Sequence, residues 1–170
     1  MEIGKIKYSI KIFEYAFKQL DEKHNKWLYE LSKIRKPDNV IYLRDVLKEN
    51  DLGMYTLMAS QSIPCLVLLS FTIELTLKLL LKQETEKEYK IHWLKDLFEK
   101  LSKQCQTEII WEVISNLNIN QERFYELINE NNQTFIDWRY MYENENQNKW
   151  SIQFLKIFYE KLKLKIEDLK

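Results

Sequence analysis

Few residues of this chain are of types that combine into a catalytic or metal-binding site. It has two histidines, His24 and His92, and two cysteines, Cys65 and Cys105. The metal motifs H-E-x-x-H, Glu-x-x-His and C-x-x-C and the nucleophile motif G-x-S-x-G do not occur, and Asp21 three residues before His24 is too little for a metal site. We therefore expect no metal and no cofactor, and we interpret both cysteines as reduced thiols of a cytoplasmic protein.

An apolar run from Phe71 to Leu81 carries one carboxylate and one amine. Glu74 and Lys78 are four residues apart, so on a helix they share a face and can pair. A carboxylate that is buried alone is costly, so Glu74 needs a partner. The candidates are Lys78, His92, Arg139 and a backbone cap.

A second stretch, residues 135–143, surrounds an arginine with aromatic side chains. Arg139 lies between Trp138 and Tyr140, and Glu143 follows one helical turn later. A guanidinium suits both a carboxylate pair and a phosphate contact, so Arg139 has a structural and a functional interpretation. For the aromatic residues, core packing is favoured over base stacking.

The shortage of glycine and proline limits the fold class. The chain of 170 residues has 2 Gly and 2 Pro. Tight β-turns and phosphate-binding loops depend on glycine, so all-β folds and nucleotide-binding glycine motifs are excluded. The prediction is an all-α helical bundle with long antiparallel helices, in a single domain of residues 1–170.

Hydrophobic periodicity predicts where the helices lie. The expected ranges are 5–34, a short helix near 41–49, a long one within 54–83, then 91–103, 107–117, 121–130, 133–143 and 149–168. The first helix carries an apolar seam that includes His24, as a core helix or a dimer seam would. Tyr8 and Tyr15 widen the stripe, which favours a core helix. Pro64 begins the regular part of the second long helix or kinks it.

The most apolar stretch, Ile63 to Leu81, contains the charged residues Glu74 and Lys78. Because of this interruption, its uninterrupted apolar residues do not reach the length of about 20 that a bilayer requires. We predict a buried core helix there and no membrane contact. The N-terminus has no signal-peptide pattern.

The charge is balanced overall, with 26 Lys and Arg against 26 Asp and Glu, but it is unevenly distributed. Residues 1–48 carry 11 basic against 7 acidic side chains, and residues 149–170 carry 6 against 3. Residues 106–148 carry 2 against 8. Zero net charge argues against a sequence-blind polyanion binder, so any RNA contact is expected from the basic first and last helices.

Three short patterns together resemble a known family. They are Glu-x-x-x-Lys at Glu74, His-x-Leu-x-x-Leu at His92 and Trp-Arg-Tyr-x-x-Glu at Trp138. In order and rough spacing they are similar to the HEPN superfamily (higher eukaryotes and prokaryotes nucleotide-binding), over residues 56–143. The resemblance implies a small all-α bundle, often a homodimer, in a bacterial or phage conflict system such as a toxin–antitoxin or antiviral defence system.

The resemblance also implies a site. Many HEPN proteins are metal-independent ribonucleases, in which an Arg and a His four to six residues later meet across the dimer interface and promote attack of the ribose 2′-OH on phosphate. Only the arginine carries over, to Arg139, because no histidine follows it at that distance. The candidate catalytic residues are Arg139, His92 and Glu143, and the candidate substrate-binding residues are Tyr140, Asn144, Glu74 and Lys78.

Two functions follow from this pattern. In the first, the protein binds or cleaves RNA or nucleotides at a cleft between two copies. In the second, it is a non-catalytic dimerisation or interaction module, in which Arg139, Glu143, Glu74 and His92 are structural. The expected partners are a second copy, RNA or a nucleotide, and a cognate antitoxin or other protein.

Overall fold

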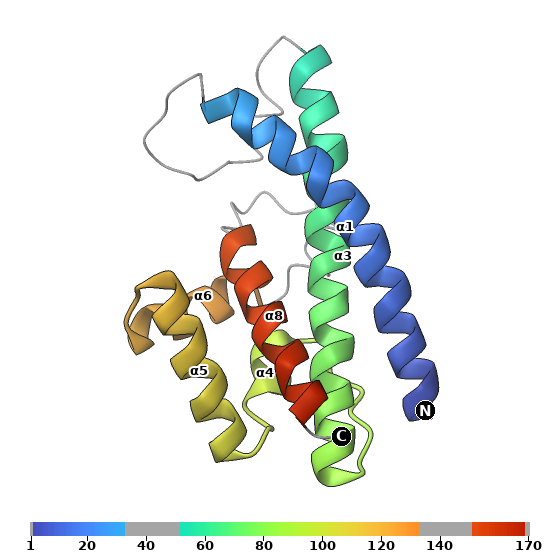
Figure 1. Ribbon diagram of the computed structural model, residues 1–170, viewed down its shortest axis with the longest axis vertical. Helices are drawn as coiled ribbons and strands as arrows, with labels where there is room; N and C mark the ends of the chain where they lie inside the picture. The colour runs from blue at the N-terminus through green and yellow to red at the C-terminus, as the bar shows by residue number, and fades with distance from the viewer. Residues whose placement is uncertain (1, 33–51, 133–150, 169–170) are drawn as a thin grey trace.

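The computed structural model describes residues 2–32, 52–132 and 151–168, and within these ranges it contains six helices and no strand (Figure 1). The helices are α1 (Ile3–Ser32), α3 (Leu52–Thr85), α4 (Leu94–Phe98), α5 (Lys103–Leu117), α6 (Gln121–Glu130) and α8 (Ile152–Asp168). The predicted all-α fold is therefore confirmed. The predicted helices 41–49 and 133–143 lie outside the described residues.

The two longest helices, α1 and α3, run antiparallel and pack along each other (Figure 1). Helix α8 lies beside α3 and runs in the same direction, and α5 packs antiparallel to α8 on its other side. The short helix α4 contacts α3 and α6. The bundle thus combines the predicted antiparallel neighbours with one parallel pair, α3 and α8.

The apolar seam of α1 faces α3 of the same chain, as predicted for a core helix. Ile6, Ile10 and Phe17 are buried, and Phe13 packs edge-on against Phe71 with ring centroids 4.7 Å apart. This burial gives the helix its tertiary stability. The side chain of His24, which the seam was predicted to include, lies outside the described part.

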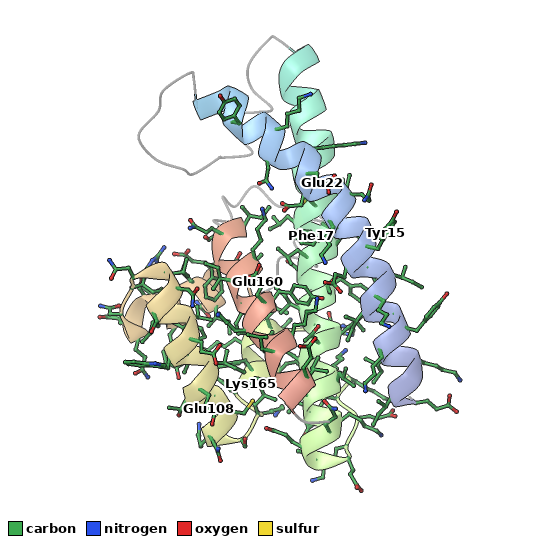
Figure 2. All side chains as sticks on the ribbon, viewed as in Figure 1. Tyr15, Phe17, Glu22, Glu108, Glu160 and Lys165 are labelled. Carbon is green, nitrogen blue, oxygen red and sulfur yellow. The ribbon has the colours of Figure 1, made fainter. Side chains whose placement is uncertain are left out.

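Tyr8 and Tyr15 do not widen the buried stripe, and this prediction is wrong. Their exposed fractions are 68% and 69%. Figure 2 shows Tyr15 on the outer side of α1 and Phe17 on the side that faces the bundle. Helix α1 is instead held in the core by the narrower apolar seam alone, which contributes about two side chains per heptad to the contact with α3.

Helix α3 is the central element of the core. It begins at Leu52, so Pro64 lies inside the helix and does not mark its start. The segment Ile63–Thr85 is long and apolar enough to cross a membrane, and 67% of its most apolar window is buried within the protein. That burial agrees with the predicted core helix, and the absence of membrane contact stays a prediction.

The helix predicted over 91–103 is much shorter than expected. Only Leu94–Phe98 is helical, and α5 already begins at Lys103. Ser102 ends the connection because its Oγ caps α5 by accepting a hydrogen bond from the Cys105 N–H at 3.3 Å. Helix α8 similarly begins at Ile152 instead of 149, after Ser151. Its first turn is capped by the Ser151 Oγ, 3.2 Å from the Phe154 nitrogen.

Lysines of α8 tie this helix to its two neighbours. Lys156 pairs with Asp21 and Lys163 with Glu14, both on α1. Lys161 pairs with Glu112 and Lys165 with Glu108, both on α5, and the last pair is labelled in Figure 2. Burial disfavours the charge of Glu14, but hydrogen bonds from Lys163 and Lys18 outweigh it and hold its pKa below the usual value. These four lysines of α8 are neutralised by carboxylates of the same chain. They therefore favour the expectation that the last helix contacts RNA less than free lysines would.

The scarcity of glycine has a visible consequence at two helix ends. Glu86, just after α3, and Asn118, just after α5, both adopt the left-handed conformation, with φ of 59° and 53°. Asparagine tolerates this region well because its short polar side chain can hydrogen-bond locally, whereas the longer glutamate side chain is not suited to do so. Glu86 is therefore the more strained of the two positions.

Replacing Glu86 with glycine is expected to raise the free energy of unfolding by about 0.5–1 kcal/mol, because relief of the left-handed strain exceeds the added flexibility of the unfolded chain. Urea denaturation measures this change. Glu86→Ala, which removes the side chain but keeps the Cβ, serves as the control and should bring no gain. If the glycine variant were no more stable than the alanine variant, the left-handed conformation at Glu86 would not be strained.

Candidate functional site

Three of the predicted site residues come together around one carboxylate. Glu74 on α3 is 2% exposed, and its Oε1 accepts a hydrogen bond from Lys78 Nζ at 2.8 Å. The same oxygen lies 3.0 Å from Nδ1 of His92. Two of the partners predicted for Glu74 are thus confirmed, and they bind the same oxygen atom.

His92 belongs to the segment between α3 and α4, and this segment is anchored at its far end. The Leu94 N–H donates to the main-chain oxygen of Asn132 at 3.3 Å, and the Lys95 N–H donates to the Asn132 side chain at 2.8 Å. Asn132 is the second residue after the end of α6. The position of His92 is therefore set from two sides, by Glu74 through the ring and by Asn132 through the neighbouring backbone.

The geometry gives the His92 ring a defined orientation. A carboxylate only accepts hydrogen bonds, so Nδ1 carries the proton in this contact and Nε2 is the basic nitrogen of the neutral ring. The side chain is 57% exposed although its carboxylate partner is buried. The ring is thus held in one orientation by a buried carboxylate and is also accessible to solvent, which is the geometry that a general acid–base residue needs.

The second carboxylate oxygen of Glu74 is also buried, and within the described ranges it accepts no hydrogen bond. A buried and unpaired carboxylate oxygen is costly, so it marks a place where a further donor would be favourable. Arg139 is the remaining side chain predicted as a partner of Glu74. It lies outside the described residues, as do Tyr140, Glu143 and Asn144.

Sequence reasoning missed the polar side chains that hold the connections around this site. Asn131 is fully buried, donates to the main-chain oxygen of Leu127 at 2.7 Å and accepts from the Ser151 N–H at 3.1 Å. Glu84 accepts from both the N–H and the Oγ of Ser102 at 2.9 Å. The adjacent asparagines after an amphipathic helix were the available signal, since such residues often bond to the backbone at helix ends.

The two cysteines do not contribute a nucleophile. Both are free, in agreement with the predicted reduced thiols, and both are buried, which was not predicted. Burial, with Asp21 nearby, raises the pKa of Cys65 to about 12, and burial, with Glu84 nearby, raises that of Cys105 to about 12. Both thiols are therefore protonated at neutral pH and unreactive as nucleophiles. Across residues 2–32, 52–132 and 151–168, no three His, Cys, Asp or Glu side chains converge on a possible metal site.

Comparison with known proteins gives no relative from which a function could be transferred. No family model matches the chain, and no curated protein and no solved structure matches it. The functional conclusion therefore rests on the chemistry of the Glu74, Lys78 and His92 site and on the sequence patterns.

Proposed function

We propose that this protein is a divergent HEPN-like protein that acts on RNA without a metal ion, with His92 as the residue that transfers the proton. The observation that carries the proposal is the pairing of an exposed imidazole with a buried carboxylate, His92 Nδ1 to Glu74 Oε1 at 3.0 Å. In the wider setting, it is a cytoplasmic protein of a bacterial or phage conflict or defence system, and its partners are a second copy, RNA and a cognate antitoxin.

The chemistry is an in-line displacement at a phosphodiester. His92 Nε2 removes the proton of a ribose 2′-OH, the 2′-oxygen attacks phosphorus, and the bond to the 5′-oxygen breaks. The protonated His92 returns this proton to the departing 5′-oxygen, so the products are a 2′,3′-cyclic phosphate and a 5′-hydroxyl. Glu74 holds the ring with the proton on Nδ1, which leaves Nε2 as the nitrogen that accepts and returns the proton.

The negative charge on phosphate needs a cationic partner, and Arg139 is the predicted one. Lys78 is held by Glu74, so its charge balances the buried carboxylate and is not free for the substrate. Tyr140, Glu143 and Asn144 complete the site in this proposal, and a second copy closes the cleft.

The test is cleavage of a 5′-labelled single-stranded RNA in the presence of EDTA. The wild type is expected to release fragments that end in a 2′,3′-cyclic phosphate. Loss of general acid–base catalysis in His92→Ala should slow cleavage by about 100- to 10,000-fold. Arg139→Ala should likewise abolish cleavage.

The matched control is Lys90→Ala, an exposed residue of the same connecting segment, purified in the same way. It should cleave like the wild type. Equal cleavage by the wild type and His92→Ala would show that the activity is a contaminant or resides elsewhere, and it would refute the proposal.

The burial of Glu74 favours the second candidate, a non-catalytic dimerisation or interaction module. In that case Glu74, Lys78 and His92 fix the packing of α3 against the segment before α4. His92→Ala and Arg139→Ala would then lower the melting temperature, and no RNA would be cleaved by the wild type. Melting curves of the same variants thus separate the two candidates.

A further inference from the structure

The outer face of α1 carries large side chains that no part of the described chain covers. Tyr8, Ile12 and Tyr15 are spaced four and three residues apart, so they line one stripe of the helix, opposite the seam that contacts α3. Ile12 is 49% exposed, and the two tyrosines are each more than two-thirds exposed. Figure 2 shows Tyr15 pointing away from the bundle.

Lysines surround this stripe. Lys5, Lys11, Lys18, Lys23 and Lys26 are all exposed along the outer side of α1. Among the side chains of α1 that the structure describes, Glu22 is the one carboxylate on that side beyond the first turn, where Glu2 pairs with Lys5. The other two carboxylates lie toward the inner side: Asp21 pairs with Lys156 of α8, and Glu14 pairs with Lys163 of α8 and with Lys18 of its own helix. We name the outer face, with Tyr8, Ile12, Tyr15 and these five lysines, the basic tyrosine face.

The charge of the basic tyrosine face decides between possible occupants. A second copy of α1 laid against it would bring lysines against lysines, which is repulsive. A negatively charged partner with flat apolar groups can pair with the lysines and stack on the tyrosine rings.

We propose that the basic tyrosine face binds single-stranded RNA. Bases stack on the rings of Tyr8 and Tyr15, and phosphates lie against the flanking lysines. Two helical turns separate the tyrosines, which places the rings about 10 Å apart along the helix. Lys11 lies between them in the sequence, so a phosphate of the same strand meets positive charge between the two stacked bases.

The choice of RNA as the strand rests on the proposed function, while the stacking and charge arguments rest on the face alone. The neutral net charge of the chain does not oppose binding here, because the acidic side chains concentrate in residues 106–148. Local charge, and not the sum over the chain, sets the attraction of a strand that contacts one helix.

The experiment is fluorescence anisotropy of a labelled oligouridylate with the full chain carrying His92→Ala, so that the probe is not consumed. Adding Tyr8→Ala or Tyr15→Ala is expected to weaken binding about tenfold for each ring. Tyr8→Phe, which keeps the ring and loses the hydroxyl, should bind nearly as well as the parent. Lys11→Glu should weaken binding and flatten its salt dependence.

The matched control is Trp111→Ala on α5. Trp111 is 68% exposed, like the tyrosines, but lies beside Glu108 and Glu112. It should leave affinity unchanged. Unchanged affinity in both tyrosine variants, equal weakening by Trp111→Ala, or equally tight binding of duplex RNA would overturn the proposal. So would a wild-type dimer that Tyr8→Ala and Tyr15→Ala convert to monomer, since the face would then bind a second copy.

The two proposals fail independently. Cleavage that depends on His92, together with binding indifferent to Tyr8 and Tyr15, would refute the basic tyrosine face and keep the proposed function. Binding that depends on the tyrosines, without any cleavage by the wild type, would refute the ribonuclease and keep the RNA-binding face.

Discussion

Replacing Phe158 with alanine is expected to lower the free energy of unfolding by about 3–5 kcal/mol. Phe158 is fully buried on α8, and its ring contacts Phe98 of α4 at 5.6 Å between centroids, Phe124 of α6 at 6.1 Å and Phe154 at 5.5 Å. Removing it deletes contacts to three rings at once and leaves a cavity between three helices. Typical domains have a stability of about 5–15 kcal/mol, so this variant would be near the limit of folding.

Urea denaturation followed by circular dichroism measures the loss, provided the variant still folds at low temperature. Phe158→Leu, which fills part of the space, should lose clearly less and keeps the test open if the alanine variant does not fold. Leu164→Ala, on an exposed position of the same helix, is the control and should change stability by about 0.5 kcal/mol or less. A loss of that same size for Phe158→Ala would contradict the central role of the aromatic cluster.

The helices of this fold could be predicted because their spacing signals are local. Asn120 illustrates this: it directly precedes the helix predicted over 121–130, and its side chain accepts a hydrogen bond from the Arg123 N–H at 2.8 Å. Phe154, Phe158 and Leu162 recur every fourth residue of the last helix, and all three are buried. Which helices those rings would contact is a property of the tertiary arrangement, which periodicity does not contain.

The wrong predictions also arose because helical spacing is a local signal. The apolar spacing of Leu94, Leu97 and Leu101 continues across the end of α4, so periodicity alone predicted one longer helix, whereas Ser102 caps the next one. Tyr8 and Tyr15 were counted as apolar, but a tyrosine has a polar hydroxyl and is stable at a wet surface. Helical spacing does not distinguish a stripe that faces the core from one that faces solvent.

The candidate site was predictable in part. The cost of burying Glu74 without a partner required a nearby cation or donor, and Lys78 follows from helix geometry alone. His92 is 18 residues away, and its contact with Glu74 depends on the path of the segment between α3 and α4. The four predicted residues from Arg139 to Asn144 lie outside the described part of the chain, so their roles stay predictions.

Removing Lys78 alone is expected to destabilise the protein by about 3–5 kcal/mol, because it breaks a buried ion pair and leaves the buried Glu74 carboxylate with His92 as its remaining partner among the described residues. The change is Lys78→Met, which keeps the length of the side chain. Lys78 is 14% exposed and Glu74 only 2%, so solvent screens the pair weakly. Thermal and urea denaturation measure the loss.

The double variant Glu74→Leu with Lys78→Met tests whether that loss comes from the carboxylate. Replacing both partners of a buried pair with apolar side chains is often neutral, so stability should return close to that of the wild type. His92 would then have lost its partner, and RNA cleavage should fall even though the fold is restored. Recovery of both stability and cleavage would show that Glu74 does not position His92. A double variant as unstable as Lys78→Met would show that the lost stability does not come from the buried carboxylate.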